Sequence, residues 1–407
     1  MKRVLVFSLA YAPFVGGAEL AIKEITDRLG DEYSFDMVTL RFDRTLPAVE
    51  KIGNVTVHRI GFTAENVKVS DRALPWQIKL AKLLFPFTAF LKANSLNRER
   101  PYDIVWAMMA NQAGFGALLF KYTHPSVPYV LELQDGNSLQ QVRERRPLVR
   151  LVGPLYRRIY LKADIIKTIS NFIKDLAREV GYHGPIVVIP NGVNIAEFSA
   201  PIADEDAADS KKKFGKTMGD IFLFTASRLV LSRGVEDVIR ALGLLPANVK
   251  FLIAGEGEDR GKLEAIAAKA GVAGRVIFAG HVDHKALPAL YKLSDIFVRP
   301  SLIEGMGSAF IEAFAAGLPV VATPVGGIPD FLSDPDRSPD TEPTGLFCNV
   351  RDSESVARAV KKYMEDPVLT ARIVKNAKEL AVQKYDWNLI ANDMREKVFA
   401  PLMKGRG

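Results

Sequence analysis

The chain of 407 residues is too long for one ordinary core, and its length predicts two domains of about 200 residues each. Hydrophobic residues make up 48% of the chain and charged residues 25%, a balance that is typical of a globular protein. The single cysteine, Cys348, excludes an intramolecular disulfide and favours a reducing compartment, so we expect a cytoplasmic protein.

Apolar strands alternate with helical patterns along the whole chain, which is typical of parallel α/β layers. The apolar run at residues 2–8 lacks a signal-type cleavage pattern and predicts a buried first strand. A helix at 18–29 follows. Further strands are expected at 35–40, 55–60, 103–107, 128–134, 164–168 and 186–189.

A second series of elements begins near residue 221. The polar stretch 190–215 starts with the turn sequence PNGVN and predicts a linker between two domains. The second series has strands at 221–229, 249–254, 275–279, 295–298, 318–322 and 345–348, and helices at 234–245, 258–271, 285–293 and from 353 onward. Two doubly wound sheets of this kind predict a ligand cleft facing the carboxyl ends of the strands.

The net charge of +7 is concentrated in the first half of the chain. Two basic and apolar stretches, 79–100 and 143–162, are shorter than the roughly 18–20 uninterrupted apolar residues that span a bilayer. Both patterns fit a helix lying on an anionic membrane surface, and both equally fit the solvated basic face of an ordinary core helix. We expect no nucleic-acid partner, because no recognition helix, zinc spacing or aromatic platform accompanies the charge.

Two glutamates, Glu304 and Glu312, flank a glycine-rich turn in the segment SLIEGMGSAFIEAFAAGLPVVATPVGG (301–327). Gly305 and Gly307 allow a ligand to approach the backbone closely. The helix start that follows offers free N–H groups to a phosphate or a sugar oxygen, and a carboxylate at Glu312 suits a ribose diol. The segment predicts a sugar-nucleotide site. The alternative is a structural turn with two solvated glutamates.

Other loops carry residues that fit the same ligand. Gly16 and Gly17 precede the first helix and suit a diphosphate or a sugar, although a purely structural turn explains them equally well. Arg228 and Arg233 stand after a strand, where two guanidiniums can neutralise a diphosphate leaving group. Gly255 opens a further turn between a strand and a helix.

His281 and His284 are spaced i, i+3 but lack a third ligand, so we expect no metal site.

Taken together, these motifs resemble the family 4 glycosyltransferases, retaining enzymes of the GT-B fold. The resemblance covers nearly the whole chain and rests on GGAE (16–19), SNFIKDL (170–176), PNGVN (190–194), SRLVLSRGVEDVIRA (227–241), GEGE (255–258), VIFAGHV (276–282) and the segment with the two glutamates. It implies a Rossmann-like acceptor-binding domain at 1–195 and a Rossmann-like donor-binding domain at 196–385. A C-terminal helix at about 386–407 would return to the first domain.

The resemblance also implies roles for single residues. Glu312 would hold the ribose, Glu304 would contact the transferred sugar, and Arg228 would meet the diphosphate. The remaining donor contacts would come from Gly16, Gly17, Arg233, Gly255, Val276, His281, Gly305, Met306, Gly307 and Ser308. The implied catalytic residues are Arg228, Arg233, Glu304 and Asp135.

The chain departs from the family pattern at two positions. The family usually has lysine where Arg233 stands, and many members have His-Asp where this chain has Gln134 and Asp135. Glutamine cannot act as a base at neutral pH, so we expect hydrogen bonding only from Gln134. Glu132 or Asp135 would then orient the acceptor.

The resemblance implies transfer of a sugar from a nucleoside-diphosphate donor, with UDP or GDP expected, to an acceptor hydroxyl, and it implies no metal or other cofactor. The basic, apolar first domain favours a lipid-linked or membrane-adjacent glycan acceptor, with the protein peripheral on the cytoplasmic membrane face. A soluble acceptor, an inactive nucleotide-sugar-binding scaffold and an epimerase of the same fold are the alternatives.

Overall fold

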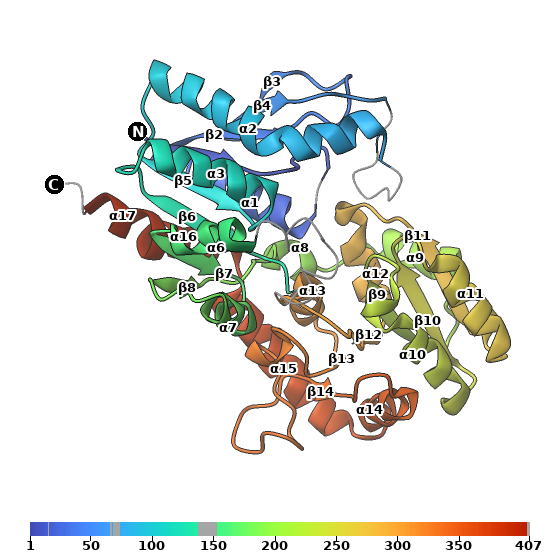
Figure 1. Cartoon of the computed structure of the whole chain (residues 1–407). Coiled ribbons are helices and arrows are strands. Elements are labelled where there is room, and N and C mark those ends of the chain that lie inside the picture. Colours follow the sequence, from blue (N-terminus) through green and yellow to red (C-terminus); the bar gives the residue numbers. More distant parts are fainter. Residues whose placement is uncertain (15, 66, 68–73, 137–152, 405–407) are drawn as a thin grey trace. The chain divides into compact units, whose positions relative to one another are not determined.

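The computed structural model describes residues 1–14, 16–65, 67, 74–136 and 153–404 (Figure 1). The chain forms two compact units. Unit 1 comprises Met1–Asn191 and Trp387–Gly407, and unit 2 comprises Gly192–Asp386. Each of the two units has its own parallel sheet and its own core.

The sheet of unit 1 has eight strands in the order β3-β4-β2-β1-β5-β6-β7-β8. All neighbouring strands are parallel except β3 and β4. The strands are β1 (Lys2–Phe7), β2 (Tyr33–Leu40), β3 (Val49–Ile52), β4 (Val55–Ile60), β5 (Ile104–Met108), β6 (Tyr129–Leu133), β7 (Ile165–Thr168) and β8 (Ile186–Val188). The central strands are buried from end to end, which explains their nearly continuous apolar sequences.

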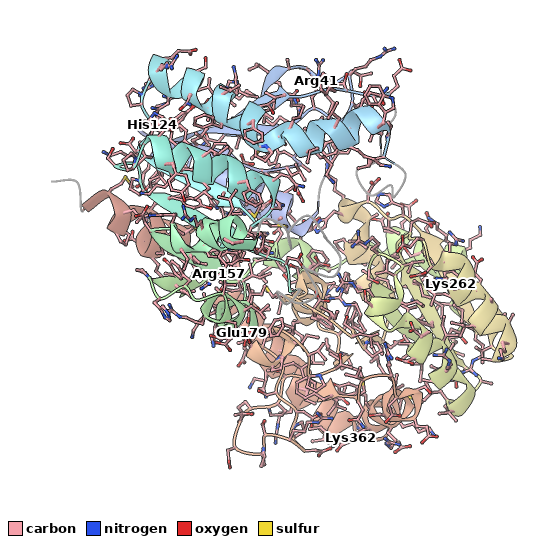
Figure 2. The ribbon with its side chains drawn as sticks, viewed as in Figure 1. Arg41, His124, Arg157, Glu179, Lys262 and Lys362 are labelled. Carbon is pink, nitrogen blue, oxygen red and sulfur yellow. The ribbon has the colours of Figure 1, made fainter. Side chains whose placement is uncertain are left out.

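Helices cover both faces of this sheet (Figure 1). They are α1 (Gly17–Arg28), α2 (Trp76–Glu99), α3 (Gln112–Thr123), α6 (Gly153–Leu161) and α7 (Asn171–Glu179). A side chain caps α7: the Ser170 hydroxyl accepts from the Ile173 N–H at the start of that helix. Arg157 on α6 (Figure 2) donates from Nε to the Val180 carbonyl at 3.0 Å and so joins α6 to the end of α7.

The C-terminal segment completes the core of unit 1. It consists of α16 (Trp387–Met394), a π-helical turn (Arg395–Phe399) and α17 (Ala400–Lys404). Trp387, Met394 and Phe399 are buried in one cluster with α1 and with β1, β2, β4 and β5. The Phe399 ring lies 5.3 Å from the Tyr33 ring and 5.9 Å from the Trp106 ring, measured between centroids. This face of the sheet is therefore sealed by residues distant in sequence.

The sheet of unit 2 has six parallel strands in the order β11-β10-β9-β12-β13-β14. They are β9 (Ile221–Ala226), β10 (Val249–Ala254), β11 (Val276–Gly280), β12 (Ile296–Arg299), β13 (Val320–Ala322) and β14 (Leu346–Phe347). The α-helices are α8 (Ile195–Ser199), α9 (Asp204–Phe214), α10 (Val235–Ala241), α11 (Arg260–Lys269), α12 (Leu287–Leu293), α13 (Ser308–Ala316), α14 (Ser353–Glu365) and α15 (Pro367–Lys384). Short 3₁₀ turns lie at Leu231–Arg233, Leu242–Leu244, Ala273–Arg275, His284–Ala286 and Ile328–Asp330.

The segment between the two sheets differs from the polar linker that we expected at 190–215. It contains α8 and α9, and α9 ends at Gly215 in the left-handed conformation (φ 65°). The helix is stable in a polar sequence because it packs on α12, and three lysines in its last turn favour the negative end of its dipole. Val193 N donates to Tyr385 O at 2.7 Å, so the first and the last residues of unit 2 lie side by side.

Two further sequence expectations concern membranes. Residues 79–99 of the first stretch lie in α2. Residues 143–152 of the second stretch lie outside the described residues, and residues 153–161 form α6. In the part of the chain that the structure describes, no helix is long and apolar enough to cross a bilayer.

Candidate functional site

In unit 2 the strand order reverses between β9 and β12, which makes this point of the sheet a candidate ligand position. The chain runs from β9 to β10 and β11 on one side, then returns to β12 and continues to β13 and β14 on the other. At such a reversal the loops leaving the two central strands diverge, and ligands of open α/β sheets bind there. Arg299, the last residue of β12, donates from Nη1 to the carbonyl of Ala226, the last residue of β9, at 3.2 Å.

Arg299 places a buried positive charge at this point of the sheet. Only 5% of the residue is exposed, and its guanidinium lies 4.2 Å from the centre of the Phe310 ring. Nη2 donates to Glu304 Oε2 at 3.0 Å. Burial lowers the pKa of Arg299, and the charge of Glu304 opposes that effect. Our sequence reasoning missed Arg299; an arginine ending the apolar strand IFVR was the available signal.

Glu304 is held by two arginines. Arg233 Nη1 donates to Oε2 at 2.6 Å, Arg299 donates to the same oxygen, and the Ser301 hydroxyl lies 3.4 Å from it. Arg233 stands in the 3₁₀ turn after β9 and therefore reaches the loop after β12. Among the described residues all of these contacts go to Oε2, and no hydrogen bond reaches Oε1. The carboxylate is thus fixed by one oxygen, with the other available.

The backbone around Glu304 requires a glycine nearby. Gly326 has φ +57°, and a Cβ placed on it would lie 1.7 Å from the Glu304 carbonyl oxygen. The next residue, Gly327, donates its N–H to that carbonyl at 3.2 Å. The GG pair at the end of the glycine-rich segment therefore packs directly against Glu304.

Glu312 lies in α13 and is anchored by Tyr291 of α12. The Tyr291 hydroxyl is 2.7 Å from Glu312 Oε2, and His284 Nε2 is 3.7 Å from Oε1. Burial, followed by the charge of Glu312, raises the pKa of Tyr291 well above its usual value, so the phenol keeps its proton and donates it. The ring itself packs edge-on against Phe224, whose centroid is 4.9 Å away. We did not identify Tyr291 from the sequence.

The turn between the glutamates presents backbone donors. Gly307 has φ +89° and precedes Ser308, the first residue of α13, so Gly305, Met306, Gly307 and Ser308 lead directly into the helix start. The first N–H groups of an α-helix lack partners within the helix and favour an anion or a sugar oxygen. This is the geometry that the sequence predicted for residues 305–308.

Most of the other predicted donor residues of unit 2 lie where its strands end. Arg228 follows β9 and is exposed; among the described residues no side chain is paired with its guanidinium. Gly255 N donates to Gly280 O at 2.7 Å, which joins the ends of β10 and β11. Val276 is the first residue of β11 and lies at the opposite edge of the sheet from these strand ends, which corrects the expectation that it contacts the donor. His281 is exposed and lies 3.6 Å from Asp283, whereas His284 faces Glu312, so the two histidines point to different partners.

No metal-binding cluster is found in unit 2 or unit 1, as far as the structure describes them: no three His, Cys, Asp or Glu side chains come together there.

In unit 1, Gly16 and Gly17 stand where the sequence placed them, at the start of α1 and after β1. The Gly16 N–H donates to Glu19 Oε2 at 2.8 Å. Unit 1 has its own reversal of strand order, between β1 and β5, so α1 begins at the edge of the sheet where a ligand is expected.

The three predicted acceptor-side residues lie at the end of β6 but differ in exposure. Asp135 is exposed and Gln134 is half-buried, whereas Glu132 has no exposed surface. Both Glu132 oxygens are occupied, by Lys167 and Gln134 on one side and Trp106 on the other. This corrects the expectation that Glu132 contacts an acceptor: any effect of Glu132 on a ligand passes through its neighbours.

Comparisons with known protein families and proteins agree with this architecture. The model for "Glycosyltransferase Family 4" matches residues 15–197, and the model for "Glycosyl transferases group 1" matches residues 206–380. An uncharacterized glycosyltransferase of Methanocaldococcus jannaschii is 26% identical over 96% of each chain. A GDP-mannose-dependent monoacylated α-(1-6)-phosphatidylinositol monomannoside mannosyltransferase of Corynebacterium glutamicum is 24% identical over 80% of this chain and 85% of its own.

Solved structures share the fold over essentially the whole length. Sucrose-phosphate synthase from Thermosynechococcus elongatus has a TM-score of 0.80 at 19% identity, with 100% of both chains covered. Anabaena HepE in complex with UDP-glucose has a TM-score of 0.75 at 21% identity, covering 98% of this chain and 100% of that one. The protein is a glycosyltransferase of the GT-B fold. It belongs to the family 4 glycosyltransferases and is an enzyme of the hexosyltransferase type.

Proposed function

We propose that the protein is a retaining glycosyltransferase whose unit 2 binds a UDP- or GDP-sugar and whose acceptor is a lipid-linked or membrane-adjacent glycan precursor. The observation that carries the donor site is the Glu304 carboxylate, fixed through Oε2 by Arg233 and Arg299. Oε1 is then oriented to accept hydrogen bonds from hydroxyls of the transferred sugar. A carboxylate held by two guanidiniums offers hydrogen-bond acceptors only, which suits the hydroxyls of a sugar rather than a phosphate.

The charge of the donor diphosphate has to be met by other groups. Arg228, exposed at the end of β9, and the backbone N–H groups at 305–308 are the donors that we assign to it. Arg233 contributes its remaining N–H groups. Glu312, oriented by Tyr291, accepts from the ribose hydroxyls, and the residues that follow β11, with His281, border the base.

Retention of the anomeric configuration is assigned to front-side attack. The acceptor oxygen forms a bond to the anomeric carbon on the face from which the diphosphate leaves, the bond to the diphosphate oxygen breaks, and the acceptor proton passes to the departing phosphate. The arginines stabilise the leaving charge. Gln134 takes no part in proton transfer, and Asp135, exposed at the end of β6, orients the acceptor.

The choice between uridine and guanosine stays open in this proposal. The name of the Corynebacterium glutamicum relative includes GDP-mannose, and Anabaena HepE binds UDP-glucose in its crystal structure. Both support a nucleoside-diphosphate sugar. We expect no metal requirement, since guanidiniums and helix N–H groups meet the diphosphate charge.

The proposed acceptor class rests on α2. Its large apolar side chains Trp76, Leu83, Phe87 and Leu91 are 57–69% exposed and follow one another at helical spacing on one side of the helix. Lys79 is exposed on the same helix. An apolar stripe beside basic residues fits the surface of an anionic membrane, where the stripe enters the headgroup layer and the lysines meet phosphates. The phosphatidylinositol-linked substrate in the name of the Corynebacterium glutamicum relative supports this choice.

The donor proposal is tested by titrating UDP-, GDP- and ADP-sugars and following thermal stabilisation, then measuring transfer and donor hydrolysis with the sugar that binds. Arg228→Ala should abolish turnover and keep the fold, because the side chain is exposed and makes no hydrogen bond or ion pair within the described residues. Arg358→Ala, an exposed arginine of the same unit, is the matched control. Near-normal transfer by Arg228→Ala contradicts the assigned site. Binding without transfer or hydrolysis in the wild type identifies an inactive scaffold, and transfer only to a free sugar identifies a soluble acceptor.

A further inference from the structure

A line of buried polar side chains crosses the sheet of unit 1. Lys167 on β7 and Glu132 on β6 are register partners, and neither has exposed surface. Lys167 Nζ lies 2.5 Å from Glu132 Oε1. Trp106 on β5 donates from Nε1 to Glu132 Oε2 at 3.0 Å. The carboxylate is therefore clamped from the strands on both sides of it.

This ion pair is not explained by stability. Burying two charges costs solvation free energy that their attraction repays only in part, and a well-packed apolar pair is often at least as stable. The surrounding strands are apolar, with Val130, Leu131 and Ile166 all fully buried. A charged pair at this place therefore points to a demand for fixed geometry.

The fixed Glu132 carboxylate orients the side chain of Gln134. Its Nε2 donates to Glu132 Oε1 at 2.7 Å and to Asn191 Oδ1 at 3.3 Å, and Asn191 Nδ2 donates back to Gln134 Oε1 at 3.0 Å. The carboxylate of Glu132 can only accept, so the Gln134 amide can adopt only one of its two orientations. That orientation in turn requires the Asn191 amide to present its NH₂ group to Gln134.

Asn191 brings this line to the start of α1. It follows β8, only 5% of it is exposed, and a Cβ placed on Gly17 would lie 4.0 Å from its Nδ2. The polar line thus runs from the interior of the sheet to the glycine pair that opens the first helix.

We propose that Gln134 is a positioning residue, which transmits the orientation of the Lys167–Glu132 pair to Asn191 and through it sets the position of the start of α1 at Gly17. This inference rests on the proposed function. Gln134 is thereby assigned an orienting role, with no part in the chemistry itself.

The test uses Gln134→Leu and Asn191→Leu in the full chain, with the donor sugar and acceptor identified as above. Each variant should lower kcat by about 10- to 100-fold, the range expected from a small misplacement of reacting groups. The donor Kd should stay within about 2-fold, because the donor contacts assigned in unit 2 are untouched. The double variant should lose no more than either single one, since both substitutions remove the same link.

A second variant addresses the ion pair without leaving an unpaired charge. Glu132→Leu/Lys167→Met replaces both buried charges by apolar groups, so the fold should be retained. It should show the same loss of kcat as Gln134→Leu. Lys51→Gln, an exposed position on β3, is the control for substitution in unit 1.

One readout needs no activity. The side-chain NH₂ resonances of Asn191, observed by NMR with selectively labelled asparagine, should shift both in Gln134→Leu and in the Glu132→Leu/Lys167→Met variant, which lies further along the line. Unchanged Asn191 resonances in the ion-pair variant overturn the inference, as does an unchanged kcat in Gln134→Leu or losses that multiply in the double variant. A wild-type protein that binds no nucleotide sugar overturns the proposed function instead, while the NMR result still decides whether the line transmits orientation.

Discussion

Arg299 reaches the Glu304 carboxylate at 3.0 Å from the interior of the sheet, while its other terminal nitrogen holds the carbonyl at the end of β9. One buried guanidinium thus ties the first strand of unit 2 to the loop that carries Glu304. This loop is therefore fixed by the core of the sheet.

Replacing Arg299 by Met should lower the free energy of unfolding by about 3 kcal/mol, because it breaks a buried charge pair and leaves Glu304 with one partner. Arg233→Met should cost clearly less stability, since the Arg233 side chain is 26% exposed and that of Arg299 only 6%. Urea unfolding of both variants measures the order. Equal losses would contradict the central place of Arg299.

Tyr291→Phe should weaken donor binding by about 10-fold, since a hydrogen bond to a charged group contributes roughly 1.5 kcal/mol. The substitution removes the donor that orients Glu312 and keeps the aromatic packing. Tyr363→Phe is the matched control: its buried hydroxyl donates to the Val320 carbonyl at 2.8 Å, with no link to Glu312. Calorimetric titration with the donor compares them, and equal Kd changes in both would refute the assignment of Glu312.

Phe87→Ser/Leu91→Ser on α2 should reduce binding to vesicles that contain anionic lipid, while the melting temperature changes by less than about 3 °C, because both side chains are exposed. Val368→Ser/Val382→Ser removes two exposed apolar side chains from unit 2 and serves as the control. Flotation at low and high salt provides the measurement, and the wild-type binding should fade as salt screens the lysines. Vesicle binding that survives the α2 substitutions would exclude this helix as the membrane-facing surface.

Stability at acid pH should depend on Asp36. Burial alone would raise the pKa of this carboxyl, but hydrogen bonds from His58, Tyr102 and Arg3 lower it below its ordinary value of 3.8. A carboxyl whose pKa is lowered by folding stabilises the fold at pH values above its ordinary pKa. That contribution disappears as the pH falls through the lowered pKa. Asp36→Asn should therefore be less stable than the wild type at pH 7.

The same variant should lose less stability than the wild type between pH 4 and pH 2. Guanidinium unfolding across that range checks the sign, and parallel curves for the two proteins would show that Asp36 does not contribute.

The sequence sufficed for the strands and for the glycine-rich turn, because buried parallel strands and helix starts have strong local patterns. It did not reveal that Arg233 and Arg299 converge on Glu304. That contact depends on β9 and β12 being neighbours, and strand order is a property of the whole sheet. Tyr291 escaped notice for the same reason: its partner, Glu312, lies on a different helix.

Three misses have local causes. Strand β3 is short and half exposed, so it lacks the apolar run that marked the others. Helix α9 has an almost entirely polar sequence, and only its packing against α12 distinguishes it from a linker. Glu132 was expected at the surface because the motif around it ends a strand. Strand β6 is buried along its whole length, so the side chains of Leu131, Glu132 and Leu133 all lie in the interior.

The C-terminal segment has a consequence for how the protein is made. Residues 387–404 emerge from the ribosome after all of unit 2, yet Trp387, Met394 and Phe399 fill the core of unit 1. During translation one apolar face of the unit 1 sheet stays uncovered while unit 2 is synthesised and can fold. Folding of unit 1 is thereby finished last, although its synthesis is begun first.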